Sequence, residues 1–220
     1  MAEHRRGFDR QLDVIDAKIM ELFGMVCADL PAVTEAVLNG HNEVAGPLAE
    51  RERAIDALYR EIEQLVCRSI LLQAPVASDL RFLLSVLRIA PELERSHDLV
   101  CHIASRAVHI SGSRRSSRCR ELIKQMDELA CGMWRRAADC WSQRDGSTAP
   151  MLAEVDEKLN ELHANLVAEL ATGTMAPPDM MEMTLVARFY ERLGDHAVNI
   201  ARRVIYLAGS NHAQPVSASR

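Results

Sequence analysis

The sequence predicts an all-α protein made of two pseudo-symmetric three-helix bundles. Three observations lead to this prediction. Aromatic residues make up only 4% of the 220 residues, Gly and Pro number only 10 and 8, and apolar residues recur at steps of three and four along most of the chain. The first two observations disfavour strands and turns, and the third is the spacing of a buried helical face.

Three long helices are predicted in the first half. The first carries an apolar stripe over 8–37 and contains Pro31, which should bend it. The second covers 48–72 and should stop at the Gln-Ala-Pro sequence that follows. The third covers 78–110, begins with Ser and Asp of the N-cap type, and should be kinked at Pro91.

The pattern begins again after a polar, arginine-containing linker at 111–118. Apolar stripes predict helices over 119–140, 152–170 and 177–208, the last of which Gly209 should close. The chain therefore divides into a domain over 1–112 and a domain over 113–220. A disordered polar tail is expected from about residue 210.

The two halves share a sequence repeat. Glu94-Arg95-x-x-Asp98 recurs 97 residues later as Glu191-Arg192-x-x-Asp195, and the second and fifth helices align at an offset of 104. The two offsets differ by seven residues, which places a shortening in the turn before the last helix. Agreement of two helices in the same order favours an internal duplication.

Charge and composition exclude several classes of protein. The chain has 26 Lys and Arg against 31 Asp and Glu, a net charge of −5, so nucleic-acid binding is disfavoured. Apolar runs are far too short to cross a bilayer, and the start does not resemble a signal peptide, which predicts a cytoplasmic protein. The six cysteines include no Cys-x-x-Cys pair and are expected to be reduced.

Acidic residues repeat on one face of the third and sixth helices. Residues four apart lie one turn above each other, so each motif aligns two carboxylates, and the next turn adds a histidine or an asparagine. Oxygen-rich sets of this kind suit Mg, Mn or Fe. A solvated stripe paired with Arg95 and Arg192 is the alternative. The candidate metal ligands are Glu94, Asp98, Glu191, Asp195, His102 and Asn199.

Three functional interpretations are compatible with these residues. One is a non-enzymatic regulator, and the blandest is a dimeric helical scaffold without metal. The other is a metal-dependent enzyme of the di-iron carboxylate type, because Glu94-x-x-His97 is the element that supplies ligands in such bundles. The equivalent position in the second half is Gly194, which weakens the enzyme interpretation.

Three segments carry a resemblance to a known family. Residues 72–81 read LQAPVASDLR, residues 92–98 read ELERSHD, and residues 188–201 read RFYERLGDHAVNIA. In this order, and over nearly the whole chain, the sequence resembles the PhoU family of phosphate-signalling regulators, in an actinobacterial form. Ser96 and His97 depart from the family pattern, in which a small apolar residue and a glycine are usual.

The resemblance implies a function as well as a fold. It implies a cytoplasmic homodimer without enzymatic activity, which represses signalling when phosphate is plentiful. Its partners would be the ATPase of the high-affinity phosphate transporter and a phosphate-sensing histidine kinase, and it would reach the membrane only through them. The resemblance also implies a divalent or ferric ion, Fe, Mn, Mg or Zn, at the two acidic motifs.

Overall fold

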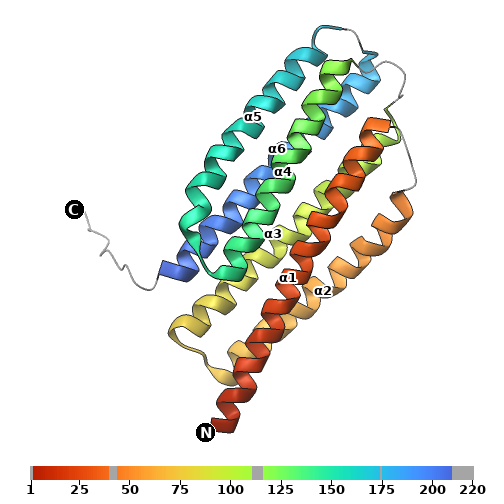
Figure 1. Cartoon of the computed structure of the whole chain (residues 1–220). Helices are drawn as coiled ribbons and strands as arrows, with labels where there is room; N and C mark the ends of the chain where they lie inside the picture. Colours follow the sequence, from red (N-terminus) through yellow and green to blue (C-terminus); the bar gives the residue numbers. More distant parts are fainter. Residues whose placement is uncertain (1, 40–43, 111–115, 174, 210–220) are drawn as a thin grey trace, which may run out of the picture.

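The computed structural model describes residues 2–39, 44–110, 116–173 and 175–209, and these ranges are almost entirely helical (Figure 1). They hold no strand, which confirms the predicted all-α class. α1 and α3 continue as helices past Pro31 and Pro91. The elements are α1 (Ala2–Asn39), α2 (Ala45–Gln73), α3 (Ala77–Ala107), α4 (Ser117–Gln143), the short 3-10 helix η1 (Gly146–Thr148), α5 (Ala149–Leu170) and α6 (Pro177–Ala208).

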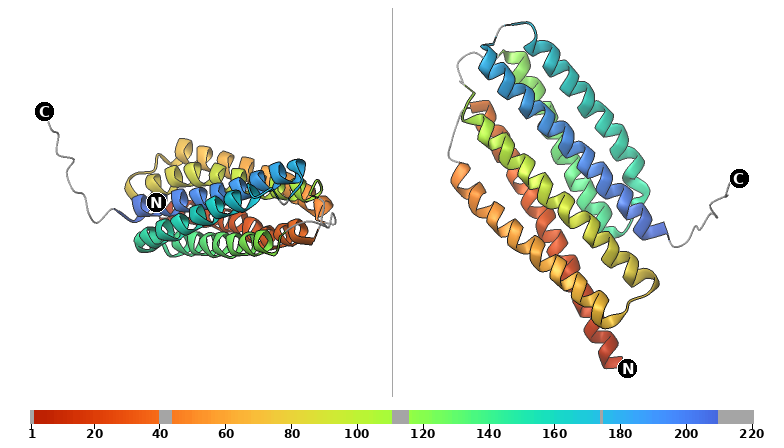
Figure 2. Two further views of the ribbon diagram at one scale, coloured as in Figure 1. Left: turned by 90° about the horizontal axis from the view of Figure 1, so that it is seen from above. Right: turned by 180° about the vertical axis from the view of Figure 1, so that it is seen from behind.

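Each half of the chain forms a three-helix bundle in which every helix packs against the other two. The two bundles lie side by side along their length and are joined by α1 against α4 and by α3 against α6 (Figures 1 and 2). α2 and α5 lie on the outer sides and pack mainly within their own bundles. This arrangement places the two motif-bearing helices, α3 and α6, next to each other at the centre.

The apolar core is continuous between the two bundles. Phe23 of α1 contacts Trp134 of α4, with ring centroids 6.2 Å apart. Trp141 of α4 stacks on Phe82 of α3 at 5.8 Å, and its indole N–H donates to Asp16 Oδ1 of α1 at 2.7 Å. Large aromatic side chains therefore bury their area at the junction of the two halves.

A polar network also crosses the junction. The Thr34 hydroxyl on α1 lies 2.7 Å from Asp127 Oδ1 on α4 and 2.5 Å from the Tyr190 hydroxyl on α6. Burial raises the pKa of Asp127, and it raises the pKa of Tyr190 well above its usual range. Because each group has a partner, the network fixes the register of three helices.

Several predicted helix ends differ in the structure. α3 begins after Val76, which makes no side-chain cap, so Ser78 and Asp79 are not its N-cap. Asp79 instead accepts a hydrogen bond from Arg5 of α1 at 2.9 Å, because the turn lies against the start of α1. Gly209 follows α6, as predicted, but with φ −70° it does not use the left-handed conformation of a glycine cap.

Some predictions concern residues outside the described ranges. They are most of the 111–118 linker, the boundary between 112 and 113, and the tail from 210. The division into two domains therefore stays a prediction. Across the described ranges, no helix combines the length and apolar character that a bilayer crossing requires. All six cysteines are free thiols, as expected.

Candidate functional site

The first acidic face lies between α2 and α3. Glu94 and Asp98 share one side of α3, as the sequence predicts, and both are half-buried. Burial raises the pKa of Glu94, and the charges of Asp98 and of Asp56 on α2 raise it further. Arg95 lowers this pKa, but its ion pair is with Glu92 at 2.9 Å. The three carboxylates therefore repel one another across a helix contact.

A cavity of about 360 Å³ opens beside this face. Its lining includes Glu52 of α2 together with Asp98, Cys101 and His102 of α3. Burial, with the charges of Glu52 and Asp98, raises the pKa of the Cys101 thiol to about 12. His102 also stacks on Phe189 of α6, with ring centroids 5.5 Å apart. The cavity thus brings two predicted ligands together with one carboxylate, Glu52, that was not among them.

The second acidic face lies between α5 and α6. Burial raises the pKa of Asp156 on α5 to about 6, and the charges of Asp195 and Glu191 on α6 act in the same direction. Asp156 Oδ1 and Asn160 Oδ1 are buried without a hydrogen-bond partner. Glu191 forms an ion pair with Arg188. Buried oxygens without donors, next to further carboxylates, offer the kind of atoms that a hard cation binds.

Gly194 lets α5 approach α6 closely at this face. A Cβ at Gly194 would lie 2.4 Å from Asp156 Oδ1 and 2.8 Å from Leu159 Cδ2. Both distances are far below van der Waals contact, so a larger residue here would force the side chains of Asp156 and Leu159 to shift. The close approach holds Asp156 against the carboxylates of α6.

The equivalent residue of the first half, His97, makes a different contact. Its side chain is 1% exposed, and its Nε2 atom lies 3.0 Å from Asp29 Oδ2 of α1. The same oxygen forms an ion pair with Arg51 Nε of α2 at 3.0 Å, so one carboxylate joins all three helices. His97 therefore turns toward α1, whereas Glu94 interacts with carboxylates on the α2 side. The Glu94-x-x-His97 element does not converge as a di-iron ligand pair.

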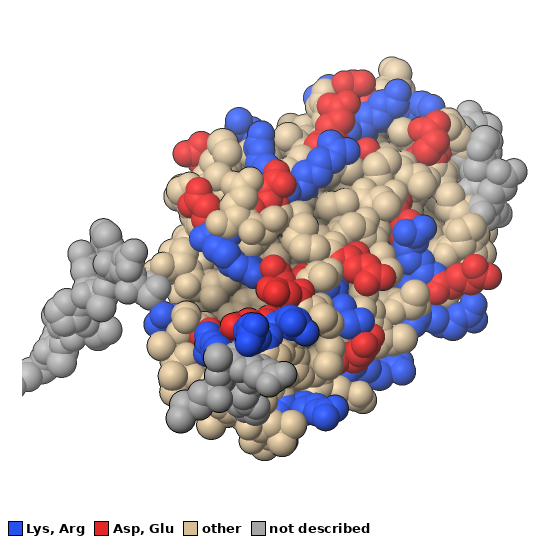
Figure 3. All heavy atoms as spheres, turned by 60° about the horizontal axis from the view of Figure 1, so that its bottom comes forward, with Lys and Arg blue, Asp and Glu red and all other residues tan. Residues whose placement is uncertain are grey.

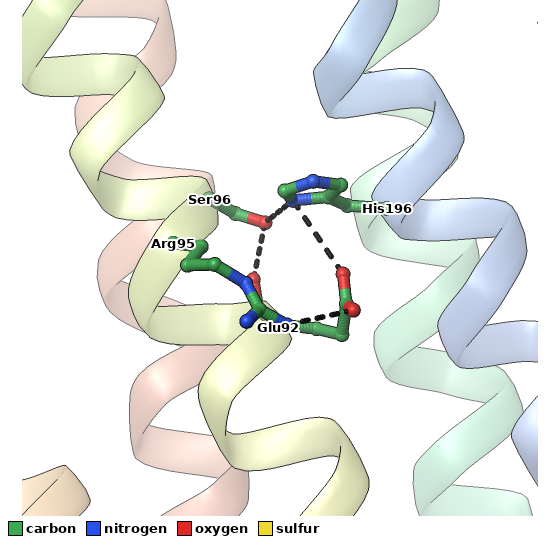
Figure 4. Close-up of polar contacts among 4 residues, drawn as sticks. All are labelled: Glu92, Arg95, Ser96 and His196. Atoms are coloured by element: carbon green, nitrogen blue, oxygen red, sulfur yellow. Dashed lines mark hydrogen bonds and ion pairs between the residues drawn. The ribbon is translucent and has the colours of Figure 1, made fainter.

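A polar joint connects α3 and α6 between the two faces (Figure 4). The Ser96 hydroxyl donates to the Glu92 carbonyl at 2.5 Å and lies 2.8 Å from His196 Nδ1. Because the hydroxyl proton is committed, His196 Nδ1 is assigned as the N–H donor to Ser96. Glu92 Oε2 lies 3.7 Å from the same nitrogen. Burial lowers the pKa of His196, against the raising effect of Glu92.

The joint is not arranged as a hydrolytic triad. In such a triad the hydroxyl and the carboxylate bind opposite nitrogens of the imidazole ring, so that a proton moves between them. Here Ser96 and Glu92 both face Nδ1 of His196. The geometry therefore serves to connect two helices.

The two acidic faces supply donor atoms of the type that a metal ion binds, but the side chains are spaced too widely to surround an ion. The second face supplies unpartnered oxygens in Asp156 and Asn160, which suits a hard cation. Asp195 and Asn199 are exposed one turn apart on α6. Within the part of the chain that the structure describes, however, no three His, Cys, Asp or Glu side chains are close enough to hold an ion. The atoms fit the expected ion in kind.

Sequence reasoning did not select the acids of α2 and α5. Glu52 and Asp56 enter the first face from α2, where Glu52-Arg53-x-x-Asp56 has the same spacing as the motifs of α3 and α6, and Asp156 enters the second face from α5. The alignment of the second and fifth helices pairs Glu52 with Asp156 and was the signal that could have found them. Elsewhere, acidic and basic side chains are interspersed on the face shown in Figure 3, in line with the small net charge.

Comparisons with known proteins agree on one family. A family model described as the PhoU domain matches residues 19–107 and 123–204. A relative from Zymomonas mobilis is 32% identical over 96% of this chain and 90% of its own length. One from Rhizobium meliloti is 29% identical over 95% and 89%. Both are named phosphate-specific transport system accessory protein PhoU homolog.

Solved structures of the same family have the same fold. The crystal structure of PhoU from Pseudomonas aeruginosa has a TM-score of 0.84 and 26% identity, and covers 91% of this chain and 98% of that chain. The phosphate transport system regulatory protein PhoU from Streptococcus pneumoniae also has a TM-score of 0.84, at 23% identity, over 95% of this chain and 100% of that chain. Relatives come from several bacterial groups and do not single out an actinobacterial form.

Proposed function

The chain belongs to the PhoU domain family, and on that premise we propose that it is an accessory regulator of phosphate transport. The observation that carries this proposal is the likeness to phosphate-specific transport accessory proteins over nearly the full length of both chains. Similarity confined to one bundle would support a shared fold alone. Here both halves match, and each half carries its acidic motif.

The finer proposal is an adaptor in the cytoplasm. In it, a homodimer of the actinobacterial form contacts the ATPase of the phosphate transporter and a phosphate-sensing histidine kinase. It represses signalling when phosphate is plentiful, and it meets the membrane only through these partners. A core that continues through both bundles supports this role, because a packed pair of bundles can hold two surfaces at a fixed spacing.

We also propose a cation on each acidic face. Glu191 and Asp195 would hold it on the second face together with Asp156, and Asn199 is one turn away. On the first face the ligands would be Glu94, Asp98 and His102. A bound Mg, Mn, Fe or Zn ion supplies positive charge that neutralises facing carboxylates. With their repulsion neutralised, the carboxylates of α5 and α6 can both bind the ion, which links the two helices.

The alternative of a di-iron enzyme is less favoured. It needs a second Glu-x-x-His, and Gly194 stands at that position in α6. It also needs His97 beside Glu94, whereas His97 bonds to Asp29 of α1. The observed contacts give His97 and Gly194 structural roles, because His97 joins α3 to α1 and Gly194 admits α5.

A thermal titration tests the cation on the second face. Mn²⁺ or Mg²⁺ added to chelator-treated protein at 100 times its dissociation constant should stabilise it by about 2.7 kcal/mol. Asp156→Asn should abolish most of that gain while raising the stability of the metal-free protein, because it removes a repelling charge. Glu154→Gln, an exposed change on the same helix, is the control. An equal response of all three proteins would refute the site.

An affinity experiment tests the adaptor. Tagged protein is purified from detergent-solubilised cells grown in high phosphate, and bound proteins are identified by mass spectrometry. We expect the transporter ATPase or the kinase to be recovered, and to be lost in low phosphate. Cells that express both proteins but yield neither would contradict the adaptor function.

A further inference from the structure

The repeat provides an internal comparison for two arginines on the seam between α3 and α6. Arg106 of α3 and Arg203 of α6 are equivalent, 97 residues apart. Arg106 reaches across the seam to Glu182 Oε2 of α6 at 3.3 Å. The residue equivalent to Glu182 in the first half is Ser85, whose hydroxyl donates to the Arg81 carbonyl of its own helix at 2.8 Å. Arg203 thus lacks the carboxylate that its counterpart has.

A second positive charge stands beside Arg203 instead. Burial lowers the pKa of Arg203, and the charge of Arg88 on α3 lowers it further. Arg88 is exposed, and neither arginine forms an ion pair with any carboxylate in the described part of the chain. Like charges facing each other across a helix contact are unfavourable, and an anion placed between them would remove the penalty.

The donors of this region are also unsatisfied and fixed in place. The Nε atoms of Arg81 and Arg203 are buried without a hydrogen-bond partner. The Nε atom of Arg106 is also unpartnered, but the guanidinium of Arg106 has Glu182 at its Nη1 atom, whereas Arg203 has no carboxylate among the described residues. The guanidinium of Arg203 lies over the Tyr206 ring at 4.0 Å, a stacking contact that orients it. A buried N–H without an acceptor costs free energy, which an external acceptor recovers. The same observations therefore point to an anionic group from outside the chain.

Residues three, four or seven apart share a helix face, and on the facing sides of α3 and α6 we define the seam patch as Arg81, Leu84, Arg88, Arg203 and Tyr206. Leu84 is 38% exposed and Tyr206 is 46% exposed, so apolar area adjoins the charges. Arginine and tyrosine next to apolar side chains are the composition of protein-binding hot spots. We propose that the seam patch docks an acidic segment of a partner protein, whose carboxylate binds Arg203 as Glu182 binds Arg106.

A protein carboxylate is favoured over a lipid headgroup by the repeat itself. The equivalent arginine, Arg106, forms an ion pair with a glutamate on a neighbouring helix, so the geometry of the seam already accommodates that group. The proposal rests on the proposed function for the identity of the partner, the transporter ATPase or the kinase. The location and chemistry of the docking surface rest on the seam alone.

A charge reversal separates docking from stability. Arg88→Glu places a carboxylate beside Arg203 within the chain, so thermal stability should stay equal or rise. The affinity for the purified transporter ATPase or kinase should fall at least tenfold, because the internal carboxylate occupies Arg203 and repels the partner's. Arg136→Glu, an exposed change on α4, makes the same change in net charge and should bind as wild type. Equal affinity of both variants would overturn the proposal.

Zero-length crosslinking identifies the group that is bound. Arg88→Lys keeps the charge and supplies an amine, which a carbodiimide joins to a contacting carboxylate as an amide. Peptide mapping should find position 88 joined to an Asp or Glu of the partner. Arg106→Lys is the matched control and should couple to Glu182 of its own chain. Coupling of the control without coupling at position 88, in a complex that forms, would refute the docking surface.

The outcomes separate the two proposals. A wild-type chain that binds neither the ATPase nor the kinase would refute the proposed function, and with it the docking surface. Binding that is insensitive to Arg88→Glu would leave the proposed function standing and refute only the seam patch. Arg88-dependent binding to phosphatidylglycerol vesicles, with no such dependence for the proteins, would replace the protein partner by a membrane surface.

Discussion

Gly194→Val is expected to destabilise the protein by about 2 to 3 kcal/mol, the usual cost of overpacking a tight contact. A Cβ at this position would lie 2.8 Å from Leu159 Cδ2, and because Leu159 is fully buried its side chain can shift only by displacing neighbours in the packed core. It would lie 2.4 Å from Asp156 Oδ1, so the carboxylate must also leave its place. The free energy of unfolding, measured with denaturant, reports the first effect. Loss of the cation response reports the second.

Gly132→Ala is the matched control for this prediction. Gly132 also lies within a helix, α4, but a Cβ there would meet nothing within 4 Å. The added methyl group should stabilise the protein by roughly 0.5 to 1 kcal/mol, because alanine favours the helix over glycine. Opposite signs at the two glycines are the expected result. A stable Gly194→Val protein with an intact cation response would contradict the close approach of α5 to α6.

Asp29→Ala should cost about 1 to 3 kcal/mol, the range for leaving a buried hydrogen-bond donor without its acceptor. Asp29 is 9% exposed, shares a hydrogen bond with His97 Nε2 and forms an ion pair with Arg51. Without it, the Nε2 atom of His97 stays buried and has no acceptor, whereas Arg51 can turn to water. The midpoint and slope of urea unfolding give the free energy of unfolding.

Two further variants test the reason for this loss. Asp29→Leu combined with His97→Leu removes both polar partners and should recover most of the stability, because no unsatisfied group remains. Asp139→Ala, at an exposed position of α4, should change stability by no more than about 0.5 kcal/mol. A loss below about 1 kcal/mol for Asp29→Ala would show that the contact between His97 and Asp29 contributes little to the stability of the first bundle.

The helices could be predicted from the sequence because each buries a stripe that the 3.6-residue period records. The acidic pairs of α3 and α6 were predictable for the same reason, since residues four apart share a face. Contacts between helices leave no such period. Asp156 joins the second face only because α5 packs closely at Gly194, and the sequence does not show which helices touch.

The position shared by His97 and Gly194 shows the limit most clearly. An aligned repeat predicts equivalent structure, yet one residue bonds to α1 and the other admits α5. The difference depends on Asp29 and Leu159, which lie far away in sequence. Arg203 is a similar case, because its lack of a carboxylate partner is visible only once α3 is known to pack against α6.

The continuous core has a consequence for the order in which the chain folds. Within each bundle, helices that are neighbours in sequence meet, so their contacts close short loops quickly. The contacts of Phe23 with Trp134 and of Ser96 with His196 instead join residues about 100 apart, and closing such loops costs more entropy. Nascent bundles should therefore form first and dock late. Until the two bundles dock, the aromatic side chains of the junction stay exposed to solvent, and the rate of docking sets how long they can cause aggregation.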